Sequence, residues 1–199
     1  MDTTRLIIVA VGGQGNLLAS SVLGEAALLS DIPLNMSEIH GMAQRGGVVE
    51  SSLVFGGAKS PIIADGEADV LVGFEPAETL RALGRCNANT VVITSLAPLM
   101  PYTVNIGQGV YPDLKQMQEL IREKTARLIA FNAASLAKES GNVLSVNMVL
   151  LGALAQTEIL PFSADTIKEA MQRKTKKAFL DSNLKAFDLG FSAAAGSQG

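Results

Sequence analysis

Short apolar runs alternate with longer segments of helical periodicity through about the first 140 residues, and helical segments dominate the rest of the chain. The first run, Leu6–Val11, is continuous and rich in β-branched residues, as in a strand that is covered on both faces. Further strands are expected over 32–39, 48–55, 68–74, 90–94 and 127–131. Residues 60–64 are expected to form a hairpin with 48–55 after a glycine turn, and 103–106 is a further candidate strand.

Helical patterns are expected over 17–30, 75–83, 113–124, 132–140, 145–156, 163–173 and 176–187. Pro76 lies in a first turn, where its missing N–H costs nothing, and Asp113 and Ser163 can cap the helices that follow them. The order of elements predicts a single α/β domain over 1–190. This is a three-layer αβα, Rossmann-like fold with a mostly parallel sheet, a β-hairpin excursion and a helical C-terminal cover. Residues 191–199 are expected to form a flexible tail.

The composition is apolar: 48% of the 199 residues are hydrophobic, 18% are charged and the mean hydropathy is +0.29. Such a chain buries much of its surface, in a two-faced core or against partner proteins. The net charge is −3 and no basic patch is interleaved with aromatic residues, so nucleic acid is not an expected ligand. No apolar run reaches the length of a membrane span, and the first run ends in glycines without a cleavage pattern. A cytoplasmic protein away from membranes is therefore expected.

The chain has one cysteine, Cys86, and one histidine, His40. A single cysteine cannot form an internal disulfide, and alone it cannot hold an iron–sulfur cluster or a structural zinc. A metal site at His40 lacks a second histidine or cysteine ligand. If the protein takes part in redox chemistry, the electron carrier is therefore expected in another chain.

A glycine turn between the first strand and the first helix is the first candidate site. It comprises Gly12, Gly13, Gln14, Gly15 and Asn16. Its open backbone N–H groups, the helix dipole and the amides of Gln14 and Asn16 suit a phosphate or a carboxylate. Against the dinucleotide fingerprint G-x-G-x-x-G, Ala10 replaces the first glycine, while Glu38 lies near the spacing of the ribose-binding acid. The alternative is that the glycines only let the strand turn into a closely packed helix.

The stretch Ser37–Gly47, SEIHGMAQRGG, is the second candidate site. Its candidate positions are Glu38, His40, Gln44, Arg45, Gly46 and Gly47. Histidine and arginine in a glycine-rich loop after a strand suit the binding of an anionic group. The alternative is a solvated loop in which Arg45 pairs with Glu38 or Glu50, and chemistry alone favours neither.

Together the two stretches resemble one family, the gamma subunits or gamma-like domains of 2-oxoacid:ferredoxin oxidoreductases. Members carry a G-V-G-G-Q-G turn, matched by Ala10–Gly15, and an E-x-x-G-x-x-Q-R-G-G loop, matched by Glu38–Gly47. The patterns at Val49–Gly56, Gly66–Glu78 and Asn147–Leu154 fit as well. The resemblance covers most of the chain. The compact size and the HGMAQRGG loop are most similar to the small beta subunit of the indolepyruvate enzymes of this family.

The resemblance implies a heteromeric enzyme that decarboxylates a 2-oxoacid, forms an acyl-CoA and passes two electrons to ferredoxin. Indolepyruvate or another arylpyruvate is the implied substrate, with branched-chain 2-oxoacids and 2-oxoglutarate left open. A large catalytic partner is expected to carry thiamine diphosphate, Mg²⁺ and the iron–sulfur clusters, with none of these bound by this chain alone. Coenzyme A is expected in a cleft that both chains share, lined by the glycine turn and the Glu38–Gly47 loop. Arg45 and the turn N–H groups would bind an anion there, and Gln44 and His40 would orient it.

Two other functions remain open from the sequence. The chain could be a stand-alone Rossmann-like module for NAD(P) or another nucleotide, which requires a complete fingerprint and its own acid–base pair. It could also be a structural assembly subunit whose loops have no part in the reaction. Tight NAD(H) binding by the isolated chain would favour the first of these, and loop variants distinguish the second from a subunit that completes an active site.

Overall fold

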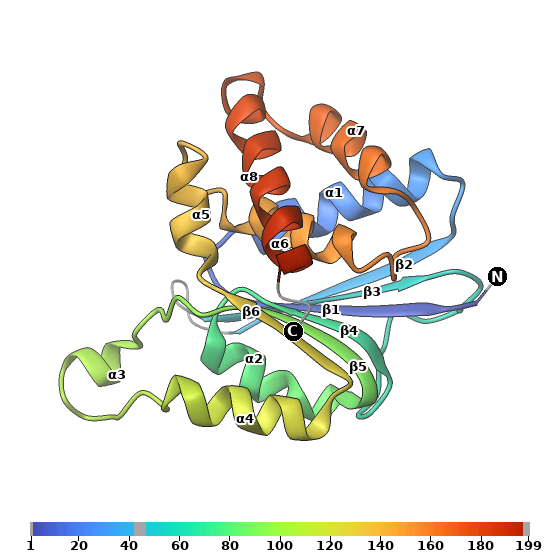
Figure 1. Ribbon diagram of the computed structural model, residues 1–199. Helices are drawn as coiled ribbons and strands as arrows, with labels where there is room; N and C mark the ends of the chain where they lie inside the picture. Colours follow the sequence, from blue (N-terminus) through green and yellow to red (C-terminus); the bar gives the residue numbers. More distant parts are fainter. Residues whose placement is uncertain (1, 42–46, 197–199) are drawn as a thin grey trace.

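The computed structural model of the protein describes residues 2–41 and 47–196. A six-stranded sheet lies between two layers of helices (Figure 1). The strands are β1 (Thr4–Val11), β2 (Leu34–His40), β3 (Val48–Phe55), β4 (Ala68–Gly73), β5 (Cys86–Ser95) and β6 (Arg127–Phe131). The predicted three-layer α/β architecture is therefore confirmed.

The strand order is β2-β3-β1-β4-β5-β6. β1, β4, β5 and β6 pair in parallel, whereas β3 runs antiparallel to both of its neighbours, β1 and β2. The prediction of a mostly parallel sheet with a hairpin excursion is confirmed, but the hairpin consists of β2 and β3. The expected pairing of residues 60–64 with β3 is wrong, because β1 and β2 already occupy both sides of that strand.

The helices follow the predicted pattern closely, except at α3 and at the C-terminal end of α8. They are α1 (Asn16–Leu29), α2 (Pro76–Ala82), the 3-10 turn η1 (Leu83–Arg85), α3 (Tyr102–Asn105), α4 (Leu114–Lys124), α5 (Ala133–Glu139), α6 (Val146–Gln156), α7 (Ala164–Lys174) and α8 (Lys177–Gly196). The side chains of Asp113 and Ser163 cap α4 and α7 as predicted. The strand expected over 103–106 is wrong. The backbone there closes local helical bonds, Asn105 N–H to Pro101 O at 3.1 Å among them.

The alternation of side chains along β1 explains the two helical layers. Leu6, Ile8 and Ala10 face a core shared with α1, α6, α7 and α8, whereas Ile7 and Val9 face a smaller core shared with α2 and α4. In Figure 1 these two groups of helices cover opposite faces of the sheet. Because both faces are covered, every inner position of this strand is apolar, and its run is continuous in the sequence.

The C-terminal helix corrects one prediction. α8 continues to Gly196 and buries Ala194, so the tail expected from residue 191 is wrong as far as residue 196, and 197–199 lie outside the described residues. Alanines favour helix, and close packing on α6 holds this segment. A Cβ added to Gly190 would lie 1.8 Å from the carbonyl oxygen of Val149 on α6, so the helices approach more closely there than any side chain allows.

Candidate functional site

The two stretches singled out from the sequence meet at one edge of the sheet. β1 ends at Val11, which pairs with Val48 at the start of β3, and His40 at the end of β2 pairs with Val49. The glycine turn therefore lies beside the described ends of the 41–47 loop. Gly12 N–H donates to Gly47 O at 2.8 Å, which joins the two stretches directly. Gln44, Arg45 and Gly46 lie outside the described residues.

The glycine turn is fixed by backbone geometry and by Gln14. Gly13 and Gly15 have φ of +100° and +84°, in the left-handed region that favours glycine. Gln14 Oε1 accepts from Val11 N–H at 2.8 Å, and Gln14 Nε2 donates to Phe74 O at 3.3 Å. This side chain was predicted to offer donors to a ligand. In the structure it ties the turn to the ends of β1 and β4.

Asn16 also directs its amide into the protein. Its side chain is buried, and Nδ2 donates to Val49 O at 3.3 Å. Oδ1 accepts from the hydroxyl of Ser51 at 3.2 Å, and the hydroxyls of Ser51 and Ser20 lie 3.0 Å apart. Ser51 Oγ also lies 3.5 Å from Glu38 Oε1. A chain of polar contacts thus connects the first residue of α1 to Glu38 on β2.

Ser20 and Ser51 are members of this polar network that the sequence interpretation missed. Both are fully buried, one inside α1 and one inside β3. A serine at an inner position of an otherwise apolar pattern must find a hydrogen-bond partner in the core, because burying an unpaired hydroxyl is costly. That mismatch between residue type and position is the signal that could have revealed them.

The space over the turn is a small cavity of about 330 Å³. It is lined by Val11, Gly12, Gly13, Gly15, Asn16, Leu17, His40 and Val49. The N-cap residue of α1 is Gly15, which has no side chain with which to cap the N–H groups of the first helical turn. Because His40 also lines it, the cavity can hold a small anionic or polar group near the positive end of the helix dipole.

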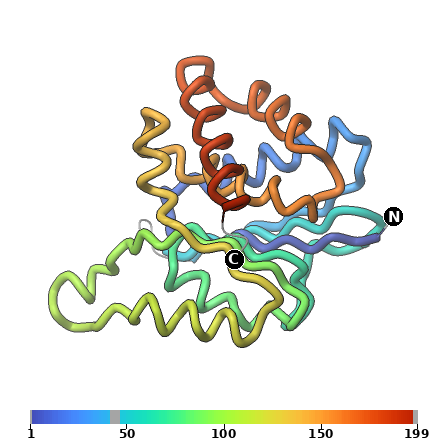
Figure 2. Tube along the Cα trace, in the orientation of Figure 1, coloured from blue at the N-terminus to red at the C-terminus, as the bar shows by residue number. Residues whose placement is uncertain are grey.

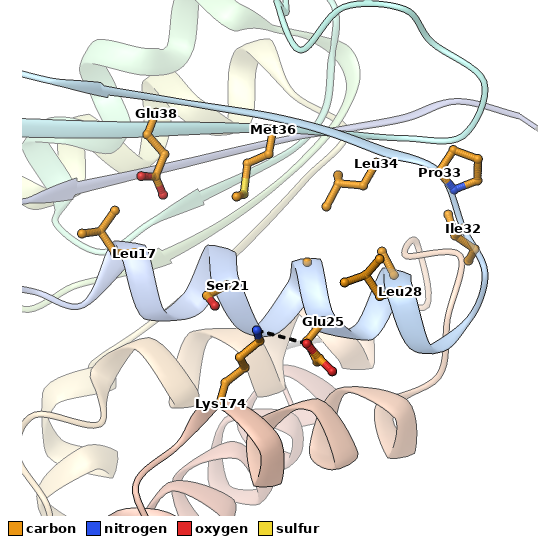
Figure 3. A pocket seen from close by; sticks show the side chains of 12 residues that line it. Leu17, Ser21, Glu25, Leu28, Ile32, Pro33, Leu34, Met36, Glu38 and Lys174 are labelled. Atoms are coloured by element: carbon orange, nitrogen blue, oxygen red, sulfur yellow. Dashed lines mark ion pairs between the residues drawn. The ribbon is translucent and has the colours of Figure 1, made fainter.

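Glu38 and His40 have different surroundings. Glu38 Oε2 lies 3.9 Å from His40 Nε2, and the histidine side chain is half exposed. Glu38 lines a second cavity, of about 610 Å³, between α1 and the edge strand β2 (Figure 3). Its other walls are mostly apolar, and the ion pair of Lys174 with Glu25, at 3.1 Å, closes one side. Among the described residues of the two predicted stretches, Glu38 alone lines this second cavity.

The position of Glu38 bears on dinucleotide binding. In that fold the ribose-binding acid follows the strand next to β1. Here β3 lies between β1 and β2, so Glu38 is carried by a strand two places from β1. The spacing in the sequence matches a dinucleotide site, but the topology does not.

The surroundings of Cys86 do not suit a cysteine that binds an iron–sulfur cluster. It is buried at the start of β5, and burial raises the pKa of its thiol from 9.0 to about 11. Within 2–41 and 47–196, no group of three or more His, Cys, Asp or Glu side chains could hold a metal ion. In the same ranges, every helix is too short or too polar to cross a lipid bilayer.

Comparison with known proteins identifies the family. Residues 5–193 match the family described as pyruvate ferredoxin/flavodoxin oxidoreductase. The indolepyruvate oxidoreductase subunit IorB of Pyrococcus horikoshii is 39% identical over 196 residues, which cover 98% of this chain and 97% of that protein.

Two solved structures share the fold. The gamma subunit of a keto/oxoacid ferredoxin oxidoreductase from Geobacter sulfurreducens has a TM-score of 0.70 at 22% identity, covering 97% of this chain and 99% of that chain. The 2-oxoglutarate:ferredoxin oxidoreductase from Magnetococcus marinus, solved with 2-oxoglutarate, coenzyme A and succinyl-CoA bound, has a TM-score of 0.75 at 20% identity. That match covers 98% of this chain and 32% of the other. The expectation from the two motifs is confirmed, and the chain belongs to the pyruvate ferredoxin/flavodoxin oxidoreductase family.

Proposed function

We propose that this chain is the small subunit of a 2-oxoacid:ferredoxin oxidoreductase that acts on indolepyruvate or another arylpyruvate. The observation that carries the proposal is 39% identity, over nearly the whole of both chains, to an indolepyruvate oxidoreductase subunit. The complex would decarboxylate the 2-oxoacid, form an acyl-CoA and pass two electrons to ferredoxin. A cytoplasmic complex is proposed with it.

In this proposal the large partner subunit holds thiamine diphosphate, Mg²⁺ and the iron–sulfur clusters, which supply the decarboxylation and electron-transfer chemistry. The one cysteine of this chain supports that division, because it is buried and its thiol pKa is raised. The role of this chain is to bind and orient: the glycine turn and the loop after β2 form one wall of the cleft. This wall lies at the carboxyl ends of the parallel strands, which is where ligands bind in open α/β folds.

We further propose that this wall contacts coenzyme A. The turn cavity offers backbone N–H groups of the first turn of α1 and the imidazole of His40. Arg45, five positions beyond His40 in the sequence, would add a fixed positive charge for the phosphates. The contents of the Magnetococcus marinus structure are consistent with a coenzyme A site in enzymes of this fold.

The test is reconstitution of the two-subunit complex and assay of indolepyruvate-dependent ferredoxin reduction with coenzyme A. Arg45→Ala is expected to raise KM for coenzyme A about tenfold or more, the effect of losing one charged hydrogen bond to phosphate. Arg122→Ala, on the exposed surface of α4, is the matched control and is expected to leave KM unchanged. Wild-type kinetics for Arg45→Ala would show that the loop takes no part in binding coenzyme A, and would favour a purely structural subunit.

Isothermal titration of the isolated chain with NADH tests the remaining alternative. The topology predicts no tight binding, because the acid at Glu38 is not on the strand beside β1. Tight NADH binding together with inactivity of the reconstituted complex toward 2-oxoacids would overturn the proposed function.

A further inference from the structure

An uncharged arm extends from the body of the protein between β5 and α4. It spans residues 96–112 and contains no Asp, Glu, Lys, Arg or His, although 18% of the whole chain is charged. In Figures 1 and 2 this green segment, with α3 at its tip, projects beyond the rest of the molecule. A surface segment of this length without a single charge is unusual, because exposed segments of globular proteins are normally polar.

The large apolar side chains of the arm face outward. Their exposed fractions are 48% for Leu99, 43% for Met100, 76% for Tyr102, 44% for Ile106 and 94% for Val110. These side chains contribute little to the cores of the domain, since both core clusters are built from other residues. Clustered apolar exposure of this kind marks a surface that another molecule covers.

Hydrogen bonds at its base hold the arm to the domain. Glu75, buried at the start of α2, accepts through Oε1 from Leu99 N–H at 3.2 Å and from the hydroxyl of Tyr111. Tyr111 Oη in turn accepts from Ala77 N–H at 3.2 Å. Burial and the neighbouring Glu75 carboxylate raise the pKa of Tyr111, so its hydroxyl remains a donor. Both ends of the arm are thus tied to one buried carboxylate.

The tip of the arm is held by its own backbone. Gln108 N–H donates to Thr103 O at 2.8 Å, and Asn105 Nδ2 donates to Met100 O at 3.4 Å. These bonds define the shape of the tip without using the apolar side chains. A partner would therefore meet side chains that are already presented, and less conformational entropy would be lost on binding.

The arm leaves the sheet at the same edge as the candidate site. It follows Ser95, the last residue of β5, and the glycine turn follows Val11, the last residue of β1. Both strands run parallel to β4, which lies between them. The arm and the glycine turn consequently extend from one edge of the sheet, and a partner that covers the turn is within reach of the arm.

We propose that the arm docks into an apolar groove on the large subunit of the complex, and this inference rests on the proposed function. The cores of protein interfaces are depleted of charge and enriched in aromatic residues and methionine, which describes Tyr102 and Met100. An uncharged arm also enters a groove without leaving an unpaired buried charge. The large subunit is the partner favoured by position, because the proposed shared cleft lies at this same edge.

The experiment measures binding of the full-length chain to the purified large subunit by biolayer interferometry. The test variant is the double substitution Tyr102→Asp with Val110→Asp. Ile62→Asp is the matched control, because Ile62 is 78% exposed and lies in the connection from β3 to β4. That connection leaves and rejoins the sheet at the edge opposite the arm. Thermal melts verify that each variant is folded, and p-benzoylphenylalanine in place of Tyr102 or Ile62 provides a second measurement by crosslinking.

The double variant is expected to weaken binding at least tenfold and Ile62→Asp less than twofold, with a crosslink to the large subunit from position 102 only. Equal affinity of the wild-type chain and the double variant would overturn the arm proposal alone. No binding by the wild-type chain would overturn the proposed function and the arm proposal with it. Arm-dependent dimers of this chain, or arm-dependent binding to neutral lipid vesicles, would assign the arm to a different partner and also overturn the proposal.

Discussion

The glycine turn provides the sharpest stability test, through Gly15→Ala. Gly15 has φ of +84°, and an L-residue in the left-handed region costs about 1–2 kcal/mol. An added Cβ would lie 2.6 Å from Asn147 Nδ2, the group that donates to Gly15 O at 3.2 Å. Displacing that amide adds the loss of one hydrogen bond, about 1 kcal/mol. We expect the variant to be about 2–3 kcal/mol less stable than the wild type.

Gly13→Ala is the matched control. Gly13 has φ of +100°, but a Cβ added there meets no atom of the described residues within 4 Å, so we expect only the backbone cost of about 1–2 kcal/mol. Urea unfolding followed by circular dichroism gives both free energies. The two glycine substitutions are then repeated in an Asn147→Ala background, where the excess cost at Gly15 is expected to vanish. Equal costs at the two glycines in the wild-type chain, or an excess that persists without Asn147, would refute the proposed contact.

Three further predictions concern buried residues. Gly190→Ala is expected to lower the free energy of unfolding by about 3 kcal/mol or more, because its Cβ would overlap Val149 O. Gly84→Ala is the control in the same urea titration, since a Cβ there meets none of the described residues within 4 Å. Cys86 is expected to react with dithionitrobenzoate far more slowly in the native protein than in urea, because burial raises its thiol pKa to about 11; equal rates would contradict this. Burial raises the pKa of Glu78 above its ordinary 4.5. Folding therefore favours its protonated form, and this contribution to stability is lost as pH rises through the raised pKa. Between about pH 4 and pH 7, the urea midpoint of unfolding should fall less in Glu78→Gln than in the wild type. An equal fall in the two proteins would argue against this role of Glu78.

The parts of the fold that the sequence predicted are those decided by local physics. The apolar run at Leu6–Val11 follows from a strand covered on both faces, and the turn at 12–15 requires glycines where φ is positive. The caps at Asp113 and Ser163 depend on side chains two or three residues from the N–H groups that they bind. Such interactions lie within one short segment, so a single sequence is sufficient to recognise them.

Local bonds formed α3 where a strand was expected over 103–106, but the other departures from the predictions depended on partners distant in the sequence. The residue types at 60–64 suit a strand, but β1 and β2 already pair with both sides of β3. The segment 191–196 has a tail-like composition, and contact with α6, whose residues precede it by about forty positions, keeps it helical. The sequence indicated that the amides of Gln14 and Asn16 could donate to a ligand. In the structure they donate to the carbonyls of Phe74 and Val49 instead.

By itself the sequence determined that a strand, a glycine turn and a helix open an α/β domain, and that the turn and the Glu38–Gly47 loop belong to one family. Tertiary structure alone decided that β3 lies between β1 and β2, and that Ser20 and Ser51 link Asn16 to Glu38. It also decided that the arm leaves the sheet at the same edge as the glycine turn. The physical reason is the distance along the sequence over which each interaction acts. Backbone conformation and periodicity are set by neighbouring residues, whereas strand order and the direction of a polar side chain depend on which distant segments fold against it.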